Sequence, residues 1–261
     1  MPAAPSPAIV ARLRDAGCVF AEDEARLLAA QARTPAELAA MVDRRVAGLP
    51  LEQVLGWAEF CGLRIAVDPG VFVPRRRTEF LVRRAIALAP PRAVAVDLCC
   101  GSGAVGAALA DALDLAELHA SDIDTAAIRC ARRNLAPRGG QVHQGDLFGP
   151  LPGALRGRVD ILAANVPYVP TSEVALLPAE ARLHEPRAAL DGGGDGLDVL
   201  RRVAAAAPQW LAPGGSLLTE TSERQAARAA RAARDSGLVP DVITSAELGA
   251  TVLVATRPGR P

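Results

Sequence analysis

Asp160-Ile161-Leu162-Ala163-Ala164-Asn165-Val166-Pro167-Tyr168 is an apolar run that ends at an asparagine and continues into a proline turn. A short apolar run bounded by turn residues predicts a buried strand. In an open parallel sheet the ligand crevice lies just outside the carboxyl ends of the strands, so we expect Asn165 and Tyr168 to project into a site. Pro167 and Pro170 fix φ and lack an N–H, which stiffens the turn and leaves nearby carbonyls free to accept hydrogen bonds.

This turn suits a planar substrate group that carries an NH2. An asparagine carbonyl beside rigid backbone acceptors can hold the N–H donors while the nitrogen lone pair stays free to attack. The tetrad Asn165-Val166-Pro167-Tyr168 resembles the Asn-Pro-Pro-Tyr signature of S-adenosylmethionine-dependent methyltransferases that modify amide or exocyclic amine nitrogens. An ordinary strand followed by a proline-rich turn is the alternative that these four residues leave open.

An earlier strand pattern, 94–98, carries Asp97 at its end and leads into a turn of small residues. These are Cys99, Cys100, Gly101, Ser102 and Gly103. The glycines tolerate positive φ and let the backbone approach a ligand closely, so we expect the turn and Asp97 to bind a cofactor. Such a turn alone also fits nucleotide-dependent reductases, although its spacing departs from GxGxxG.

Acids also end the next two predicted strands. Asp122 follows the glycine turn by about twenty residues, the position where a carboxylate can bind both hydroxyls of a ribose. Asp146 ends the following strand, where we expect it to bind the adenine amine while Leu147 and Phe148 cover the ring face. One such acid alone could be a helix N-cap, but three at successive strand ends favour a nucleotide site.

The rest of the chain divides into three predicted parts. Residues 1–57 form a small helical bundle with helices at 8–16, 22–32 and 35–46, which either caps the larger domain or docks a partner. Residues 58–73 are predicted as a β-hairpin linker whose strands, 63–67 and 71–73, flank the turn 68–70. Residues 74–261 alternate strand and helix, which predicts a mostly parallel sheet with helices on both faces.

Composition excludes several classes of protein. No apolar stretch approaches the ~18 residues that a membrane span needs, and residues 1–7 lack the pattern of a secretion signal, so we expect a frayed leader on a cytoplasmic protein. The five cysteines have no CxxC spacing, which argues against a metal site or a disulfide framework. Basic and acidic residues number 29 each, so we expect no stable nucleic-acid binding.

Two further segments extend the resemblance over nearly the whole chain. Pro69-Gly70-Val71-Phe72-Val73-Pro74-Arg75 with Thr78-Glu79, and the loop from Glu185-Pro186 to Asp195-Gly196-Leu197-Asp198, are similar to segments of the HemK/PrmC family. These are protein-(glutamine N5) methyltransferases that act on peptide-chain release factors. The resemblance implies an α/β, Rossmann-like, seven-stranded methyltransferase sheet with an antiparallel last strand, behind a small N-terminal helical domain.

The resemblance also assigns the site. S-adenosyl-L-methionine is expected to lie across 99–103, Asp122, 146–147 and Asn165, and a glutamine, expected in the GGQ motif of a release factor, against 165–168. Family members usually have Gly where Cys99 stands and Pro where Val166 stands. Val166 still offers a carbonyl, so we expect a functional variant, with either a looser turn or a shifted substrate.

The mechanism expected is direct in-line transfer of the sulfonium methyl to the amide nitrogen, with Asn165, Pro167 and Tyr168 as catalytic residues. No histidine or cysteine constellation offers general-base chemistry, so catalysis is expected to depend on positioning and on acceptors for the N–H groups. Three alternatives stay open: a DNA or RNA methyltransferase acting on adenine amines, a nucleotide-dependent reductase, and a catalytically impaired S-adenosylmethionine-binding protein. The sequence leaves open which protein is methylated and whether the chain self-associates.

Overall fold

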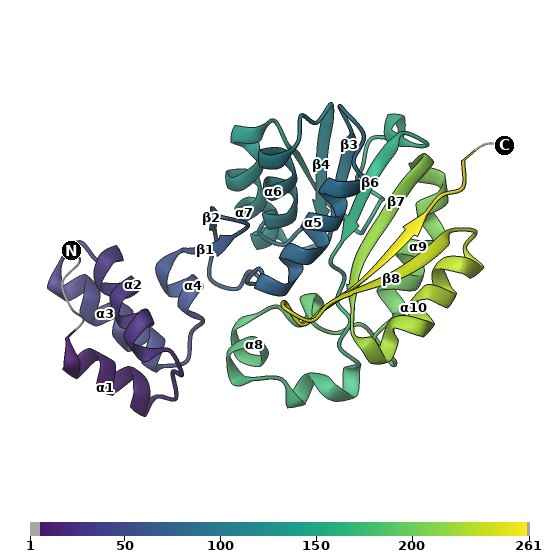
Figure 1. Cartoon of the computed structure of the whole chain (residues 1–261). Coiled ribbons are helices and arrows are strands. Elements are labelled where there is room, and N and C mark those ends of the chain that lie inside the picture. The colour runs from purple at the N-terminus through teal and green to yellow at the C-terminus, as the bar shows by residue number, and fades with distance from the viewer. Residues whose placement is uncertain (1–5, 260–261) are drawn as a thin grey trace.

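The computed structural model describes residues 6–259, so most of the predicted frayed leader, residues 1–5, lies outside the described part. A mixed seven-stranded sheet forms the centre of the molecule (Figure 1). Its strands lie in the order β5-β4-β3-β6-β7-β9-β8. Their bounds are β3 Val94–Leu98, β4 Glu117–Asp122, β5 Gln141–Gln144, β6 Val159–Ala164, β7 Leu211–Thr221, β8 Val239–Ser245 and β9 Ala250–Thr256.

The sheet is parallel except at its last strand. β3, β4, β5, β6 and β7 pair in parallel, whereas β9 is antiparallel to both β7 and β8. The order reverses between β3 and β6, because β4 and β5 extend from one side of β3 while β6 and β7 extend from the other. Such a switch point opens a crevice at the carboxyl ends of the strands. The predicted Rossmann-like sheet with an antiparallel last strand is confirmed.

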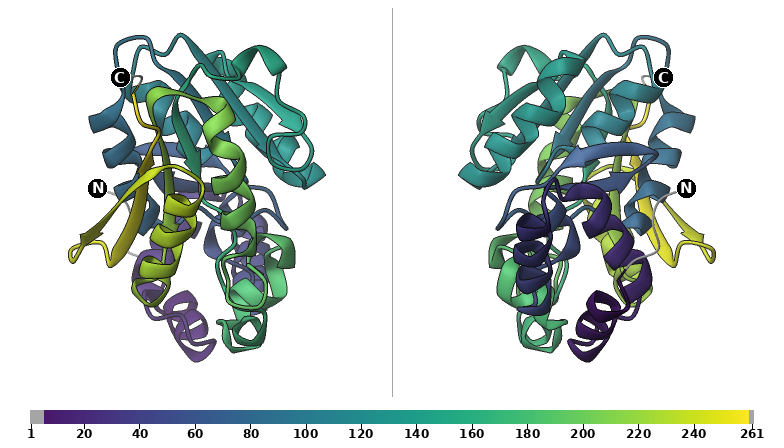
Figure 2. Two further views of the ribbon diagram at one scale, coloured as in Figure 1. Left: turned by 90° about the vertical axis from the view of Figure 1, so that its right-hand side faces the viewer. Right: turned by 90° about the vertical axis from the view of Figure 1, so that its left-hand side faces the viewer.

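Helices cover both faces of this sheet, as Figure 2 shows from two sides. One apolar core lies between the sheet and α5 Glu79–Leu88, α6 Ala104–Ala112 and α7 Thr125–Leu135. The other lies beneath α9 Asp198–Trp210 and α10 Glu223–Asp235. The central strands are buried on both faces, which explains why β3 and β6 are almost uninterrupted apolar runs.

The N-terminal helices form a separate apolar cluster. They are α1 Pro7–Asp15, α2 Ala21–Gln31, α3 Pro35–Val46 and the short α4 Leu51–Leu55. Thr34 caps α3, since its hydroxyl accepts the backbone N–H of Glu37 at 3.1 Å. None of the helices within residues 6–259 is long and apolar enough to cross a membrane.

Two polar contacts join these helices to α8 Ala179–His184, which lies between β6 and α9 in the chain. The buried guanidinium of Arg45 pairs with Glu24 at 2.6 Å and with Glu180 at 2.7 Å. The amide of Gln53 donates to the carbonyl of His184 at 3.3 Å. The helical cluster therefore contacts the segment that follows the predicted catalytic turn.

The hairpin lies one strand earlier than predicted. β1 Trp57–Phe60 pairs antiparallel with β2 Leu63–Ala66, and the turn falls at Cys61-Gly62. The predicted second strand, 71–73, has no strand partner among residues 6–259, and 68–70 leads out of the hairpin. Gly62, with a φ of +75°, supplies the tight turn that the sequence predicts at 68–70.

Candidate active site

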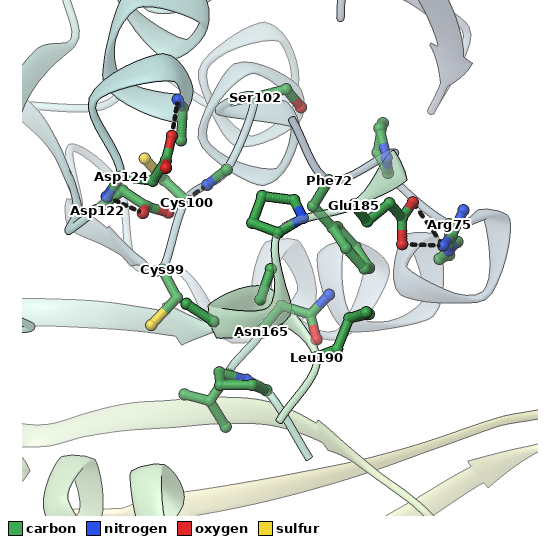
Figure 3. Close-up of a pocket in the computed structure, with 18 of the residues that line it drawn as sticks. Phe72, Arg75, Cys99, Cys100, Ser102, Asp122, Asp124, Asn165, Glu185 and Leu190 are labelled. Atoms are coloured by element: carbon green, nitrogen blue, oxygen red, sulfur yellow. Dashed lines mark hydrogen bonds and ion pairs between the residues drawn. The ribbon is translucent and has the colours of Figure 1, made fainter. Parts of the chain in front are cut away.

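A cavity of about 700 Å³ opens at the carboxyl ends of β3, β4 and β6, at the point where the strand order reverses. Figure 3 shows the turn after β3 and Asp122 on one side, and the pair formed by Arg75 and Glu185 on the other. Twelve of the thirteen predicted site residues line this one cavity. They are Asp97, Cys99, Cys100, Gly101, Ser102, Asp122, Asp146, Leu147, Asn165, Val166, Pro167 and Tyr168.

Gly103 is the predicted site residue that does not line the cavity. It is the N-cap of α6, with a φ of +76°, and a Cβ there would lie 3.1 Å from the Leu135 side chain and 3.2 Å from Ala131. A side chain at Gly103 would crowd α7, and the positive φ also favours glycine there. Gly101 has a φ of +54° and lines the cavity, as the sequence predicted. Cys99 also has a positive φ, +53°, although it carries a side chain.

Asp97 is buried beneath this turn. Its side chain accepts the backbone N–H of Gly106 at 2.9 Å, so it braces the first turn of α6. The residue is only 1% exposed, and burial, with a further contribution from the charge of Asp122, raises the pKa of Asp97 to about 7.

This raised pKa predicts that stability falls with rising pH. Between the usual aspartate pKa near 3.8 and the folded value of about 7, the folded chain keeps a proton that the unfolded chain has lost. Asp97 should therefore lower the free energy of unfolding by about 1.4 kcal/mol per pH unit across that window. Denaturant titrations of the cofactor-free wild type and of D97N between pH 5 and 8 would show the wild type losing stability relative to D97N as the pH rises. Parallel curves would contradict the assignment.

Asp122 lies opposite the glycine turn at the end of β4. One carboxylate oxygen accepts the N–H of Gly101 and the other that of Asp124, each at 2.9 Å. Burial, the largest influence, raises the pKa of Asp122. Each oxygen keeps a further lone pair, and Asp122 lines the cavity, so the carboxylate can accept hydrogen bonds from a vicinal diol.

Beyond β5, the structure separates residues that the sequence grouped together. Leu147 lines the cavity, but Phe148 is buried in the core and stacks on Trp210 at a centroid distance of 5.3 Å. The prediction that Phe148 covers an adenine ring is therefore wrong. Asp146 forms an ion pair with Arg202 of α9, and both line the cavity mouth. Since β5 ends at Gln144, Asp146 belongs to the loop rather than to the strand.

Asn165 comes directly after β6 and lines the cavity, between Phe72 and Leu190 in Figure 3. Its Nδ2 donates to the Thr78 hydroxyl at 3.5 Å. Its Oδ1 is buried and has no hydrogen-bond partner among residues 6–259. A buried carbonyl without a donor lowers the stability of the fold by roughly 1–3 kcal/mol. A ligand N–H that bound this oxygen would remove that penalty.

The next residues in the turn supply a second acceptor, at Val166, and an anchored side chain, at Tyr168. The backbone carbonyl of Val166 receives no hydrogen bond from the described chain, so it offers a second acceptor beside Asn165. The Tyr168 hydroxyl donates to Glu220 at 2.9 Å and also contacts the guanidinium of Arg77. Burial, reinforced by the Glu220 charge, raises the pKa of Tyr168, which keeps the phenol protonated.

The glycine-rich loop after Glu185 packs directly on this turn. A Cβ at Gly192 would lie 2.6 Å from the Pro167 carbonyl oxygen and 2.8 Å from the Tyr168 Cα. The backbone N–H of Gly192 donates to Val169 at 2.8 Å. The loop therefore packs closely against the backbone of the turn, and this close packing requires glycine at position 192.

Gly192→Ala should displace the turn. Because the clashing atoms are backbone, we expect a loss of about 1–3 kcal/mol in unfolding free energy and a lower turnover number. Gly194→Ala is the matched control, since a Cβ there meets nothing within 4 Å. Denaturant unfolding and initial rates of both variants test this expectation, and equal behaviour of the two would contradict it.

Among the cavity residues that the sequence did not reveal as site residues are Thr78, Glu185, Arg202 and Phe72. The side chain of Glu185 is 1% exposed, and it accepts from Arg75 and from the Val73 N–H. These contacts join the two segments on which the family resemblance was based. The quoted motifs already contained Thr78, Phe72 and Glu185, but nothing in their spacing showed that they meet. No group of acidic, histidine and cysteine side chains within residues 6–259 is arranged to hold a metal ion.

Comparisons with known proteins agree with this geometry. Residues 62–208 match the model of the methyltransferase small domain. A release factor glutamine methyltransferase of Geobacter sulfurreducens is 43% identical over 74% of this chain and 68% of its own length. One from Mycolicibacterium smegmatis is 38% identical over 87% of this chain and 82% of its own.

A relative with a different substrate is also similar. The 4-amino-L-phenylalanine/4-methylamino-L-phenylalanine methyltransferase of Streptomyces pristinaespiralis is 38% identical over 71% of this chain and 65% of its own length. Relatives at this level of identity are thus named for different substrates, a release factor glutamine and 4-amino-L-phenylalanine. With a matching domain model and extensive identity to proteins of one name, this chain belongs to the release factor glutamine methyltransferase family.

Proposed function

We propose that this protein transfers a methyl group from S-adenosyl-L-methionine to the side-chain amide nitrogen of a glutamine in a peptide-chain release factor. The observation that carries the proposal is that Asn165 lines the same cavity as Asp122 and that its Oδ1 has no hydrogen-bond partner among residues 6–259. An acceptor at that position can bind an amide N–H, and a carboxylate across the cavity can bind a ribose.

The cavity fits S-adenosylmethionine. Gly101 leaves room for the backbone to approach the ligand, and Asp122 retains acceptors for the ribose hydroxyls. Asp97 and the turn 99–102 border the same space, while Asp146 and Leu147 suit the amine and the face of an adenine. When bound, the cofactor supplies an electrophilic methyl group on a positively charged sulfur.

The residues of the chain contribute by orienting the nucleophile. An amide nitrogen is a weak nucleophile, so it must be held in line with the methyl carbon and kept from turning away. Asn165 Oδ1 and the Val166 carbonyl can accept the two N–H groups of the glutamine amide and stabilise the positive charge that develops on its nitrogen. As the N–C bond would form and the sulfonium S–C bond would break, the amide nitrogen would release one of its two protons to solvent.

The two departures from the family pattern leave this arrangement in place. Val166 is buried and keeps its carbonyl, and the supporting loop at Gly192 packs on Pro167 rather than on Val166. Cys99 adopts the positive φ that the usual glycine would take. Burial raises the pKa of Cys99, so the thiol stays neutral beside the cofactor. We therefore expect an active enzyme.

Methyl transfer with labelled S-adenosylmethionine tests the proposal. Purified release factor, a release factor with its candidate glutamine changed to glutamate, transfer RNA, duplex DNA and 4-aminophenylalanine are offered in separate reactions. Label in the unmodified release factor alone supports the proposal. Label in nucleic acid would support the adenine-methyltransferase alternative, and label in 4-aminophenylalanine would support a small-amine substrate. A cytoplasmic location, where such a substrate is made and used, remains a prediction.

A further inference from the structure

Glu220, near the end of β7, is a buried carboxylate beside the catalytic turn, and the sequence analysis gave it no role. It is 3% exposed and accepts three hydrogen bonds. They come from Arg77 Nε at 2.5 Å, from the Thr78 hydroxyl at 2.7 Å and from the Tyr168 hydroxyl at 2.9 Å. Two of these donors contact the site directly, because Thr78 touches Asn165 and Tyr168 follows it in the turn.

The contact to Glu220 decides which way the Thr78 hydroxyl points. A hydroxyl has one proton, and a carboxylate offers only acceptors, so the proton of Thr78 is committed to Glu220. Towards Asn165, at 3.5 Å, the Thr78 oxygen therefore presents a lone pair. That lone pair attracts an NH2 group and repels a carbonyl oxygen.

This polarity fixes the Asn165 amide. The two ends of an amide have almost the same shape, so packing alone does not select one orientation. With its NH2 towards Thr78, the amide turns Oδ1 away, to the buried position where the described chain provides no donor. The opposite orientation would set two oxygens against each other and turn NH2 donors towards the substrate nitrogen.

We propose that Glu220 is a positioning residue that acts through Thr78 to orient the Asn165 carbonyl towards the substrate amide. The inference rests on the proposed function, because it deepens the role of Asn165 there. A purely structural role, in which Glu220 only anchors Arg77 and Tyr168, would make the Thr78 hydroxyl unimportant for catalysis. The two roles therefore predict different behaviour of Thr78 variants.

Glu220→Gln should reverse the chain of hydrogen bonds. Arg77 Nε and the Tyr168 hydroxyl both donate, so they hold the Gln oxygen, and its NH2 then faces Thr78. Thr78 would accept from that NH2 and turn its own proton towards Asn165. The asparagine carbonyl is then drawn away from the substrate. We expect kcat to fall by roughly 10- to 100-fold, the range for one hydrogen bond to a charged group.

Thr78 variants separate the two roles. Thr78→Val keeps the shape but removes the hydroxyl, so kcat should fall by about 10-fold or more while cofactor affinity is unchanged. Thr78→Ser restores the hydroxyl and should recover most of the lost turnover. If Glu220 acts through Thr78, the double variant T78V/E220Q should be no slower than E220Q alone.

The experiment measures kcat, the KM for release factor and the affinity for S-adenosylhomocysteine, with thermal unfolding to confirm that each variant is folded. Glu223→Gln, an exposed acid three residues further along, is the matched control and should behave as the wild type. A lower kcat in T78V with recovery in T78S supports the inference. Full turnover in a folded T78V, or additive losses in the double variant, would overturn it. A wild type that labels no release factor would instead contradict the proposed function.

Discussion

Asn165→Ala is expected to reduce methyl transfer by at least about 100-fold while S-adenosylhomocysteine affinity largely survives. Removing one preorganised hydrogen-bonding group from a catalytic site costs roughly 10²–10³ in turnover. Asn165 offers such a group, since the residue lines the cavity and its Oδ1 lacks a partner among residues 6–259. Single-turnover rates at saturating release factor, with affinity from isothermal titration, provide the measurement.

The control for this variant is Gln209→Ala, which removes an exposed amide on α9 far along the chain from the catalytic turn. It should retain normal rates. If Asn165→Ala loses cofactor affinity and rate in equal proportion, the asparagine holds the cofactor rather than the substrate. Normal turnover of Asn165→Ala would refute the catalytic assignment.

Asp122→Ala is expected to have the largest effect on cofactor binding. A hydrogen bond to a charged group contributes about 1.5–3 kcal/mol, and a carboxylate on both ribose hydroxyls makes two, so affinity should fall by about 100-fold or more. The same change also removes the acceptor that Gly101 and Asp124 share, which loosens the glycine turn. Titration with S-adenosylhomocysteine measures the loss.

Asp111→Ala serves as the control for Asp122→Ala, because Asp111 is an exposed acid on α6 outside the cavity. Asp122→Asn separates charge from shape, since it preserves one acceptor and should bind with intermediate affinity. An unchanged affinity in Asp122→Ala would show that the ribose lies elsewhere in the cavity.

The sheet could be predicted from the sequence because its central strands are buried on both faces. In a chain whose strands alternate with helices, short apolar runs such as 94–98 and 159–164 indicate the buried strands of a parallel sheet. The polar residues at their carboxyl ends were predicted to converge, and Asn165, Asp97 and Asp122 do line one cavity.

What the sequence could not predict depends on contacts between distant segments. The hairpin was misplaced because 68–70 has strong turn residues, whereas the turn that forms uses Cys61 and Gly62. Phe148 follows two cavity residues, yet the way its loop leaves β5 directs the ring to Trp210 in the core. No local pattern distinguishes these outcomes, since both depend on how the loop packs.

The support beneath Asn165 was hidden for the same reason. Glu220 lies 142 positions from Thr78 in the chain, and β7 brings the two together. An acid at the end of a strand resembles the other strand-end acids until the structure shows that it is buried against an arginine and a tyrosine. The sequence therefore revealed groups that line the cavity but not the residues that contact them from beneath.

The most direct test is a crystal structure of the enzyme with S-adenosylhomocysteine and a release-factor peptide that contains the glutamine. The account predicts that the glutamine nitrogen donates to Asn165 Oδ1 and points at the cofactor sulfur, with the ribose on Asp122. A glutamine bound away from Asn165, or an asparagine amide turned with its NH2 towards the substrate, would contradict it.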